Sequence, residues 1–240
     1  MEGFRSKLQW WWNVNWLKTV YFNFRMFPFS IARQLPVVFY GKVHFANLSG
    51  RFRINAPIRR AMIGFGQPYE NITRSKGTAE LFLAGEIIMS GHVQFGKDYF
   101  VYVAETARLE MGHMASLGGN GKIMCYRQIV FGDYARLGFE SQVMDSNFHE
   151  MIDTESGSVY PMTQPIALGN YNYFGNRISV MPGTTTGDYC TVATMSLLNR
   201  DYSGLGRNIL IGGIPARLLK ENISRNWEGE QINLEKWLIV

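Results

Sequence analysis

The sequence predicts an all-β protein, a parallel β-helix built from six-residue repeats. The main observation is a period of six in the second half, where five of six positions are apolar: Leu168, Phe174, Val180, Thr186, Val192 and Leu198. Four residues after these positions come residues that are mostly small: Asn172, Ile178, Thr184, Cys190 and Ser196. Glycine also follows the first position repeatedly, at Gly169, Gly175 and Gly187.

A period of six has a direct structural meaning. One hexapeptide forms a short strand and a corner, and three hexapeptides close one turn of a triangular solenoid. The large apolar residue points to the axis, the small residue fits the crowded corner, and successive turns hydrogen-bond about 4.8 Å apart. An α-helix is excluded, because a period of six drifts around a helix with about 3.6 residues per turn.

The same template fits earlier parts of the chain. Its large positions there are Phe95, Val101, Phe131, Leu137 and Val143, with small residues at Ala135 and Ser141. Between residues 107 and 128 the register is poor, so we expect a bulge or a loop in that segment.

These patterns divide the chain into three parts. Residues 1–48 form an N-terminal extension or cap, residues 49–210 form the β-helix, and residues 211–240 form a short tail that is partly helical. The repeat is interrupted at about 145–166, where we expect a loop ejected from the solenoid wall. Such loops are where repeat proteins carry function.

The first 30 residues combine many aromatic side chains with Lys and Arg. Two interpretations remain open. The rings cap the open end of the repeat core or pack against another subunit, because a repeat stack needs an end cap. Alternatively, the segment lies on a bilayer, with Trp and Tyr at the headgroups and cations near anionic lipid. It lacks the features of a signal peptide, and no apolar stretch is long enough to predict a membrane span.

Composition and charge narrow the function further. With 46% hydrophobic and 18% charged residues, the chain is globular. A net charge of +5 suits solubility, an anionic nucleotide ligand or an anionic membrane, whereas no basic stripe or base-stacking motif predicts nucleic-acid binding. Cys125 and Cys190 form neither a disulfide framework nor a metal-ligand pattern. We therefore expect buried thiols in a cytoplasmic protein, peripheral at the inner membrane face if the N-terminal segment binds lipid.

Four segments carry a family resemblance. They are Asp145-Ser-Asn-Phe-His149, Pro165–Asn170 with Tyr173–Gly175, Thr191–Arg200, and Gly212–Arg217. In their residues, order and spacing they resemble the hexapeptide-repeat acyltransferases, particularly the bacterial sugar and polysaccharide O-acetyltransferases. The strong resemblance covers roughly residues 130–220.

The resemblance implies a left-handed β-helix, an exception to the usual right-handed crossover. It also implies a homotrimer with active sites between subunits, and acetyl-CoA as the acyl donor, without a metal. The positions that correspond to the family's cofactor-binding segments are Gly175, Ala193, Thr194, Ser196, Arg200 and Arg217. The two guanidinium groups suit the CoA phosphates, because Arg binds phosphate oxygens in a fork, and Lys220 is an auxiliary cation.

Acetyl transfer to a hydroxyl needs a base for the proton that leaves as the oxygen attacks the thioester. We assign this role to His149, because imidazole titrates near neutral pH and His149 lies at the base of the expected loop. If residues 145–149 are extended, Asp145, Asn147 and His149 project to one side. Asp145 then orients His149 or holds the sugar hydroxyl, and Asn147 binds the acceptor or the thioester.

Two other functions remain open. The degenerate repeats of the first half are compatible with a non-catalytic β-helix scaffold. A zinc-dependent, carbonic-anhydrase-like lyase needs three ligands and room for water, and the four His residues show no such set. For an O-acetyltransferase, the aromatic and basic N-terminus favours a surface polysaccharide or its lipid-linked repeat unit as acceptor, although a free sugar, an antibiotic or an amino acid also fits.

Overall fold

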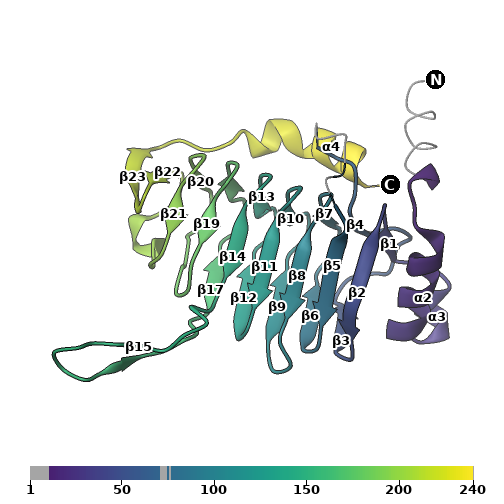
Figure 1. Cartoon of the computed structure of the whole chain (residues 1–240). Helices are drawn as coiled ribbons and strands as arrows, with labels where there is room; N and C mark the ends of the chain where they lie inside the picture. Colours follow the sequence, from purple (N-terminus) through teal and green to yellow (C-terminus); the bar gives the residue numbers. More distant parts are fainter. Residues whose placement is uncertain (1–10, 71–74, 76, 240) are drawn as a thin grey trace.

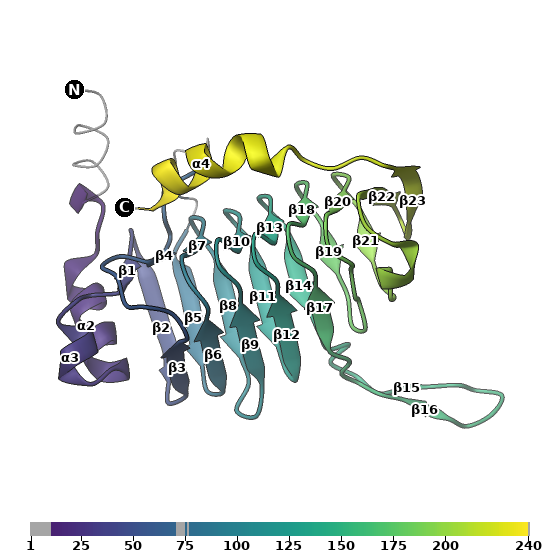
Figure 2. The ribbon, with the colours of Figure 1, turned by 180° about the vertical axis from the view of Figure 1, so that it is seen from behind.

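The chain forms a parallel β-helix, as the six-residue period predicts (Figure 1). The computed structural model describes residues 11–70, 75 and 77–239. Three sheets form the walls of the solenoid, and most turns of the chain add one strand to each wall. A long hairpin leaves the solenoid in its second half, and helices lie across its N-terminal end (Figure 2).

The walls are built almost entirely of parallel strands. The first wall contains β1 (Val37–Phe39), β4 (Ile63–Phe65), β7 (Val93–Phe95), β10 (Ser116–Leu117), β13 (Arg136–Leu137), β18 (Tyr173–Phe174), β20 (Cys190–Val192), β22 (Ile209–Gly213) and β23 (Ala216–Glu221). The second wall contains β2 (Val43–Leu48), β5 (Ala79–Leu83), β8 (Phe100–Val103), β11 (Lys122–Cys125), β14 (Gln142–Met144), β19 (Ser179–Val180) and β21 (Leu197–Leu198). The third wall contains β3 (Arg51–Ile54), β6 (Glu86–Met89), β9 (Arg108–Met111), β12 (Gln128–Phe131) and β17 (Ile166–Leu168).

The remaining elements lie outside the walls. They are α2 (Trp16–Met26), α3 (Phe29–Ala32), the hairpin strands β15 (Met151–Ile152) and β16 (Val159–Tyr160), the 3₁₀ helix η1 (Ser203–Leu205) and α4 (Trp227–Leu238).

The large repeat positions form the core, as predicted. From Phe95 to Leu198 each of them is at most 4% exposed. The small positions are buried as well, and polar side chains at these positions form hydrogen bonds inside the solenoid. The Asn172 side chain donates to Thr186 Oγ1 at 2.7 Å and accepts from the Cys190 amide at 2.7 Å. A buried polar group is tolerated when it is hydrogen-bonded in this way.

The glycines that follow the large positions have a steric cause. A Cβ added at Gly96 would lie 2.3 Å from the Gly119 nitrogen, and one at Gly169 would lie 2.5 Å from the Gly187 oxygen. Both contacts are with backbone atoms of the next turn, which cannot move aside without breaking the stack. Glycine is therefore required where the corners of successive turns touch.

The prediction of a bulge or loop between residues 107 and 128 is wrong, because strands β9, β10 and β11 run through this segment in register with their neighbours. Near the C-terminal end Ser179 pairs with Leu197, which makes one turn from three hexapeptides. Earlier, Phe100 pairs with Lys122, so the turn is longer. The extra residues lie in longer strands and wider corners of the second and third walls, which a strict period of six does not detect.

Helix α2 caps the N-terminal end of the core. Phe22 is fully buried, with its ring centroid 5.0 Å from that of Phe39 and 5.3 Å from that of Phe52. The Asn23 side chain donates to the Val37 carbonyl at 2.7 Å, which ties the helix to the first strand. Because β1 and β2 lie within residues 1–48, the β-helix begins inside the segment expected to be an extension or cap.

The tail after the last full turn is partly helical, as predicted. Strand β23 pairs antiparallel with β22, and the chain then returns along the side of the solenoid as α4 (Figure 1). Trp227 is 4% exposed and packs against Tyr134 and Tyr171, with ring centroids about 6 Å apart. The tail therefore covers one corner of the solenoid rather than its end.

Candidate functional site

The interruption of the repeat is a projecting hairpin, as expected for a loop ejected from the wall (Figure 2). It leaves after β14 of the second wall and returns at β17 of the third wall. Its antiparallel strands β15 and β16 carry apolar side chains that are more than half exposed, namely Met151, Ile152, Val159 and Tyr160. An exposed apolar hairpin is typical of a segment that packs against another molecule.

Asp145 anchors the base of this hairpin. Its carboxylate is fully buried and accepts three backbone hydrogen bonds. Oδ1 accepts from the Tyr126 amide at 2.7 Å, and Oδ2 accepts from the amides of Arg127 and Gln128 at 2.8 Å each. These amides belong to the corner of the preceding turn, so the carboxylate fastens the point at which the hairpin leaves the wall.

His149 and Asn147 lie on the other side of this point, in solvent. Both side chains are exposed. The expectation that Asp145, Asn147 and His149 share one face is therefore wrong for the single chain. The chain is not extended here, because Phe148 adopts a φ of +62°.

Two residues that sequence reasoning missed fix this bend. The Ser146 hydroxyl accepts from the Phe148 amide at 3.0 Å, a local turn that Ser favours two residues before its donor. The Phe148 ring contacts the Tyr126 ring edge-on, with centroids 5.3 Å apart. A positive φ is uncommon for a bulky residue in general, but in this chain Tyr134, Tyr171 and Tyr189 also adopt it, so it does not distinguish this segment.

The predicted cofactor residues lie mainly at another corner. Gly175 follows β18, and Ala193 and Thr194 follow β20, so all three lie where the chain turns from the first wall to the second. A Cβ at Gly175 would lie 2.6 Å from Thr194 Oγ1, so the two turns pack in direct contact. Thr194 is exposed and Ala193 is half-buried, so small residues line this part of the corner, next to the exposed Met195. We call Gly175, Ala193 and Thr194 the small-residue wall.

Ser196 has a structural place at this corner. It is 2% exposed, its hydroxyl donates to the Ala193 carbonyl at 2.6 Å, and it accepts from the Gly213 amide at 3.0 Å. These bonds join the corner to the terminal strand β22. Ser196 thus shapes the small-residue wall from inside rather than facing solvent.

The predicted cations lie at the C-terminal end of the solenoid. Arg200 follows β21 and places its guanidinium over the Tyr202 ring, 5.2 Å from the centroid. Arg217 and Lys220 lie on β23, and all three side chains are exposed. None of the ion pairs between described residues involves these three cations.

The predicted site residues are therefore not gathered in one chain. The hairpin with His149 leaves the corner between the second and third walls, whereas Gly175 and Thr194 lie between the first and second walls. Both corners adjoin the second wall but lie on its opposite edges.

The other histidines do not form a metal site with His149. His92 and His113 are neighbours at the corner under α4, with ring centroids 5.8 Å apart. Burial, together with the nearby His113 and Arg59, lowers the pKa of His92 to about 4. Among the described residues no group of three or more His, Cys, Asp or Glu side chains is placed to hold a metal ion.

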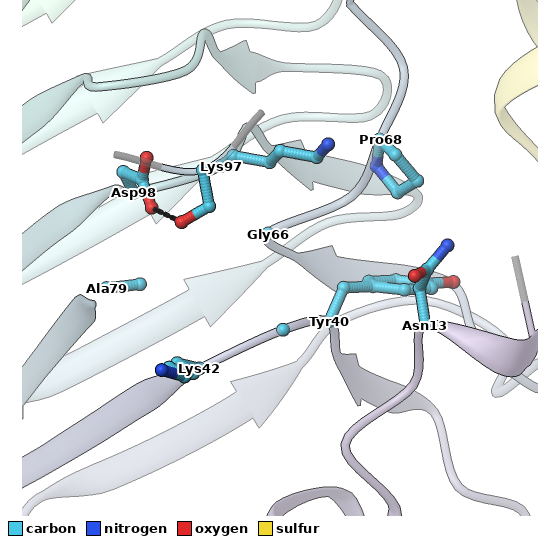
Figure 3. A pocket seen from close by; sticks show the side chains of 10 residues that line it. Asn13, Tyr40, Lys42, Gly66, Pro68, Ala79, Lys97 and Asp98 are labelled. Carbon is cyan, nitrogen blue, oxygen red and sulfur yellow. Dashed lines mark hydrogen bonds between the residues drawn. The ribbon is translucent and has the colours of Figure 1, made fainter. Parts of the chain in front are cut away.

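A separate pocket of about 210 Å³ lies near the N-terminal end, away from the predicted site (Figure 3). Tyr40, Lys42, Lys97 and Asp98 are among its lining residues. Sequence reasoning did not single out any of them, because they come from different turns and form no motif.

The thiols agree with the expectation from sequence. Cys125 and Cys190 are both free and buried. Burial raises the pKa of Cys190 to about 12, and it also raises the pKa of Cys125, where the nearby Asp145 carboxylate acts in the same direction. In the described part of the chain, no helix has the length and hydropathy needed to cross a membrane.

Comparisons with known proteins support the resemblance seen in the sequence. The chain is 29% identical to the galactoside O-acetyltransferase of Escherichia coli (strain K12) over 73 residues, which are 30% of this chain and 32% of that enzyme. The match thus spans about a third of the length of this relative. No family model matches the chain.

Solved structures extend the likeness to most of the chain. The polysialic-acid-specific acetyltransferase NeuO covers 79% of this chain and 78% of its own, with a TM-score of 0.50 and 15% identity. AntD, an N-acyltransferase from Bacillus cereus, covers 88% of this chain and 96% of its own, with a TM-score of 0.48 and 12% identity. The fold is a left-handed β-helix, and the chain is similar to the hexapeptide-repeat acyltransferases, as its motifs predict.

Proposed function

We propose that this protein is an acetyl-CoA-dependent O-acetyltransferase that modifies a sugar hydroxyl, with His149 as general base. The observation that carries the proposal is the placement of His149. It is an exposed imidazole near the root of a projecting hairpin, and three backbone hydrogen bonds to Asp145 fix the point where this hairpin leaves the wall. The similarity to acetyltransferases supports the reaction class.

In the proposed reaction the acceptor hydroxyl gives its proton to the His149 imidazole as its oxygen attacks the thioester carbonyl. The carbon–sulfur bond then breaks, and the thiolate of CoA leaves and takes up the proton. Asn147, which is exposed two residues away, supplies an amide to the acceptor or to the thioester oxygen. A general base of this kind contributes about 10²–10⁴-fold to the rate.

Acetyl-CoA fits the wall of small residues at the other corner. Gly175, Ala193 and Thr194 would give a pantetheine arm a path of small residues along the wall, beside the exposed side chain of Met195. Arg200, Arg217 and Lys220 add three exposed cations at the end of the solenoid, where phosphate oxygens can pair with them.

The separation of these two groups favours a site shared between copies. One chain places His149 and the small-residue wall on opposite edges of the second wall. The apolar hairpin also exposes Ile152 and Val159, by 58% and 59%. A second copy that packs against the hairpin would cover these side chains and bring its own small-residue corner towards His149. We propose a homotrimer, since a ring of three identical contacts closes on itself.

The acceptor is proposed to be a surface polysaccharide or its lipid-linked repeat unit, made in the cytoplasm. This choice rests on the aromatic and basic N-terminal segment, which suits an enzyme that works beside a membrane. Free sugars and glycan fragments are therefore the first acceptors to test.

The test is thiol release from acetyl-CoA in the presence of a panel of sugars and glycan fragments. We expect acceptor-dependent release that His149→Ala reduces about 10²–10⁴-fold. His44→Ala is the matched control, because His44 is also exposed but lies on β2, and this variant should keep full activity.

Other outcomes separate the alternatives. Full activity of His149→Ala would exclude His149 as the base. Absent release together with absent CoA binding would support the non-catalytic scaffold. Stoichiometric zinc in the purified protein would support the lyase.

A further inference from the structure

Helix α2 packs one face against the core, and its opposite, outward face is rich in apolar side chains. Phe22, Asn23 and Thr19 point inward and are fully buried. The opposite face and its surroundings carry seven large apolar side chains that are exposed: Trp12 (82%), Leu17 (80%), Phe29 (71%), Tyr21 (54%), Phe24 (48%), Trp16 (44%) and Val20 (43%). A helix that only caps a core has one apolar stripe and a polar outer face. The exposed apolar residues on the outer face of α2 therefore indicate a binding surface.

The charged side chains of the chain segment that forms this end of the molecule are all cationic, and one of them, Arg53, is paired with Glu86 of the next turn. Residues 11–69 contain no Asp or Glu, whereas they contain eight Lys and Arg: Lys18, Arg25, Arg33, Lys42, Arg51, Arg53, Arg59 and Arg60. The remainder of the chain is correspondingly acidic, because the whole protein has a net charge of only +5. Such charge asymmetry within one chain indicates binding to an anionic surface.

Two of these cations flank the apolar face directly. Arg25 lies in the last turn of α2 and Arg33 follows α3, and both side chains are exposed. No ion pair between described residues involves either of them. A second copy of the same face would bring like charges together, which disfavours an end-to-end dimer as the partner.

We propose that the outer face of α2 and α3 docks this protein on an anionic lipid bilayer. Trp and Tyr rings settle at the headgroup level, Leu17, Val20 and Phe24 enter the acyl boundary, and the arginines meet lipid phosphates. Helix α2 lies across the end of the solenoid in both views (Figures 1 and 2). Docking through this face therefore makes the solenoid stand out from the membrane rather than lie along it.

The test is sedimentation of the full chain with vesicles of phosphatidylcholine alone and of phosphatidylcholine mixed with phosphatidylglycerol. We expect binding to the mixed vesicles that weakens as salt is added. The double variant Leu17→Ser, Phe24→Ser should reduce the partition coefficient by at least about a hundredfold, because it removes two apolar side chains from the interface. The double variant Arg25→Gln, Arg33→Gln should reduce it about 25-fold, at about fivefold per cation.

Matched controls change the same residue types elsewhere. Ile232→Ser with Trp237→Ser removes two exposed apolar side chains from α4, and Lys122→Gln with Arg207→Gln removes two exposed cations from the walls and corners. Both control proteins should bind the mixed vesicles as the parent does. Acetyl transfer to a water-soluble acceptor should be unchanged in the α2 variants, so the docking test is independent of the proposed catalysis.

Three results would overturn the proposal. They are absent binding to the mixed vesicles, equal loss of binding in the controls, and binding that ignores both salt and lipid charge. Light scattering adds a fourth: if the α2 variants change the oligomeric state without changing vesicle binding, the face contacts a second copy instead.

Discussion

Replacing Asp145 tests whether this carboxylate only holds the root of the projecting hairpin or also takes part in the proposed chemistry. Its three backbone hydrogen bonds join two successive turns at the root of the hairpin. Asp145→Ala leaves the amides of Tyr126, Arg127 and Gln128 without their charged acceptor. Each unsatisfied buried donor costs about 1–3 kcal/mol, and water reaches part of this corner, so we expect a loss of about 3 kcal/mol.

Asp145→Asn should cost about half as much. One amide oxygen can still accept from Arg127 and Gln128, whereas the NH₂ group then faces the Tyr126 amide and cannot accept from it. The expected order is therefore parent, Asn variant and Ala variant. This order follows from hydrogen-bond geometry alone and requires no role in catalysis.

Hydrogen exchange measured by mass spectrometry reads the effect locally. The segment 122–131 should lose about a hundredfold of its protection in Asp145→Ala, since about 1.4 kcal/mol corresponds to a factor of ten. Asp153→Ala is the control, because Asp153 also accepts from two backbone amides but is only half-buried and lies in the projecting hairpin. That variant should leave the protection of segment 122–131 unchanged.

A different result would refute this reasoning. If Asp145→Asn abolishes acetyl transfer while the hydrogen-exchange protection of residues 122–131 stays at the parent level, the carboxylate acts on the reacting groups. The structural role would then be wrong.

Three further predictions concern the core. Ellman's reagent should react with neither Cys125 nor Cys190 in the native protein at pH 8 and with both in urea, because burial raises the pKa of each thiol. Burial and the neighbouring charges lower the pKa of His92 to about 4, so the free energy of unfolding should be constant above about pH 6.5 and fall by up to about 3 kcal/mol as the pH drops to 4. Urea titrations at about pH 6.5 and about pH 4 should show a smaller loss for His92→Leu. Gly169→Ala should lower the urea midpoint strongly, whereas Gly204→Ala, with open space around its Cβ, should not.

The period of six predicted the solenoid because the same physical demand recurs at every corner. An apolar residue such as Phe174 must point to the axis, and Gly169 must leave room for the next turn. The period failed between residues 107 and 128 for a related reason. There the strands are longer and the corners wider, so the inward positions are kept but their spacing is not.

The local geometry of the site was less predictable. Alternation along the chain placed Asp145 with His149, but alternation holds only for an extended backbone. The positive φ of Phe148 turns the chain, and the residue type Phe does not predict a positive φ. Ser146, whose hydroxyl accepts from the amide two residues on, was the available signal. The outer apolar face of α2 was also hidden in the sequence, because aromatic residues that cap a core and those that face solvent have the same composition.

The two proposals place geometric demands on one another. In the second wall, β2 lies beside α2, and the hairpin with His149 begins after β14. Four strand spacings of about 4.8 Å separate β2 from β14. A base on this hairpin therefore works about 20 Å or more above a membrane that is bound through α2. An acceptor held close to the lipid headgroups would not reach it, whereas the distal sugars of a lipid-linked glycan would. Docking through α2 thus favours an extended glycan over a short lipid-linked sugar as the acceptor of the proposed reaction.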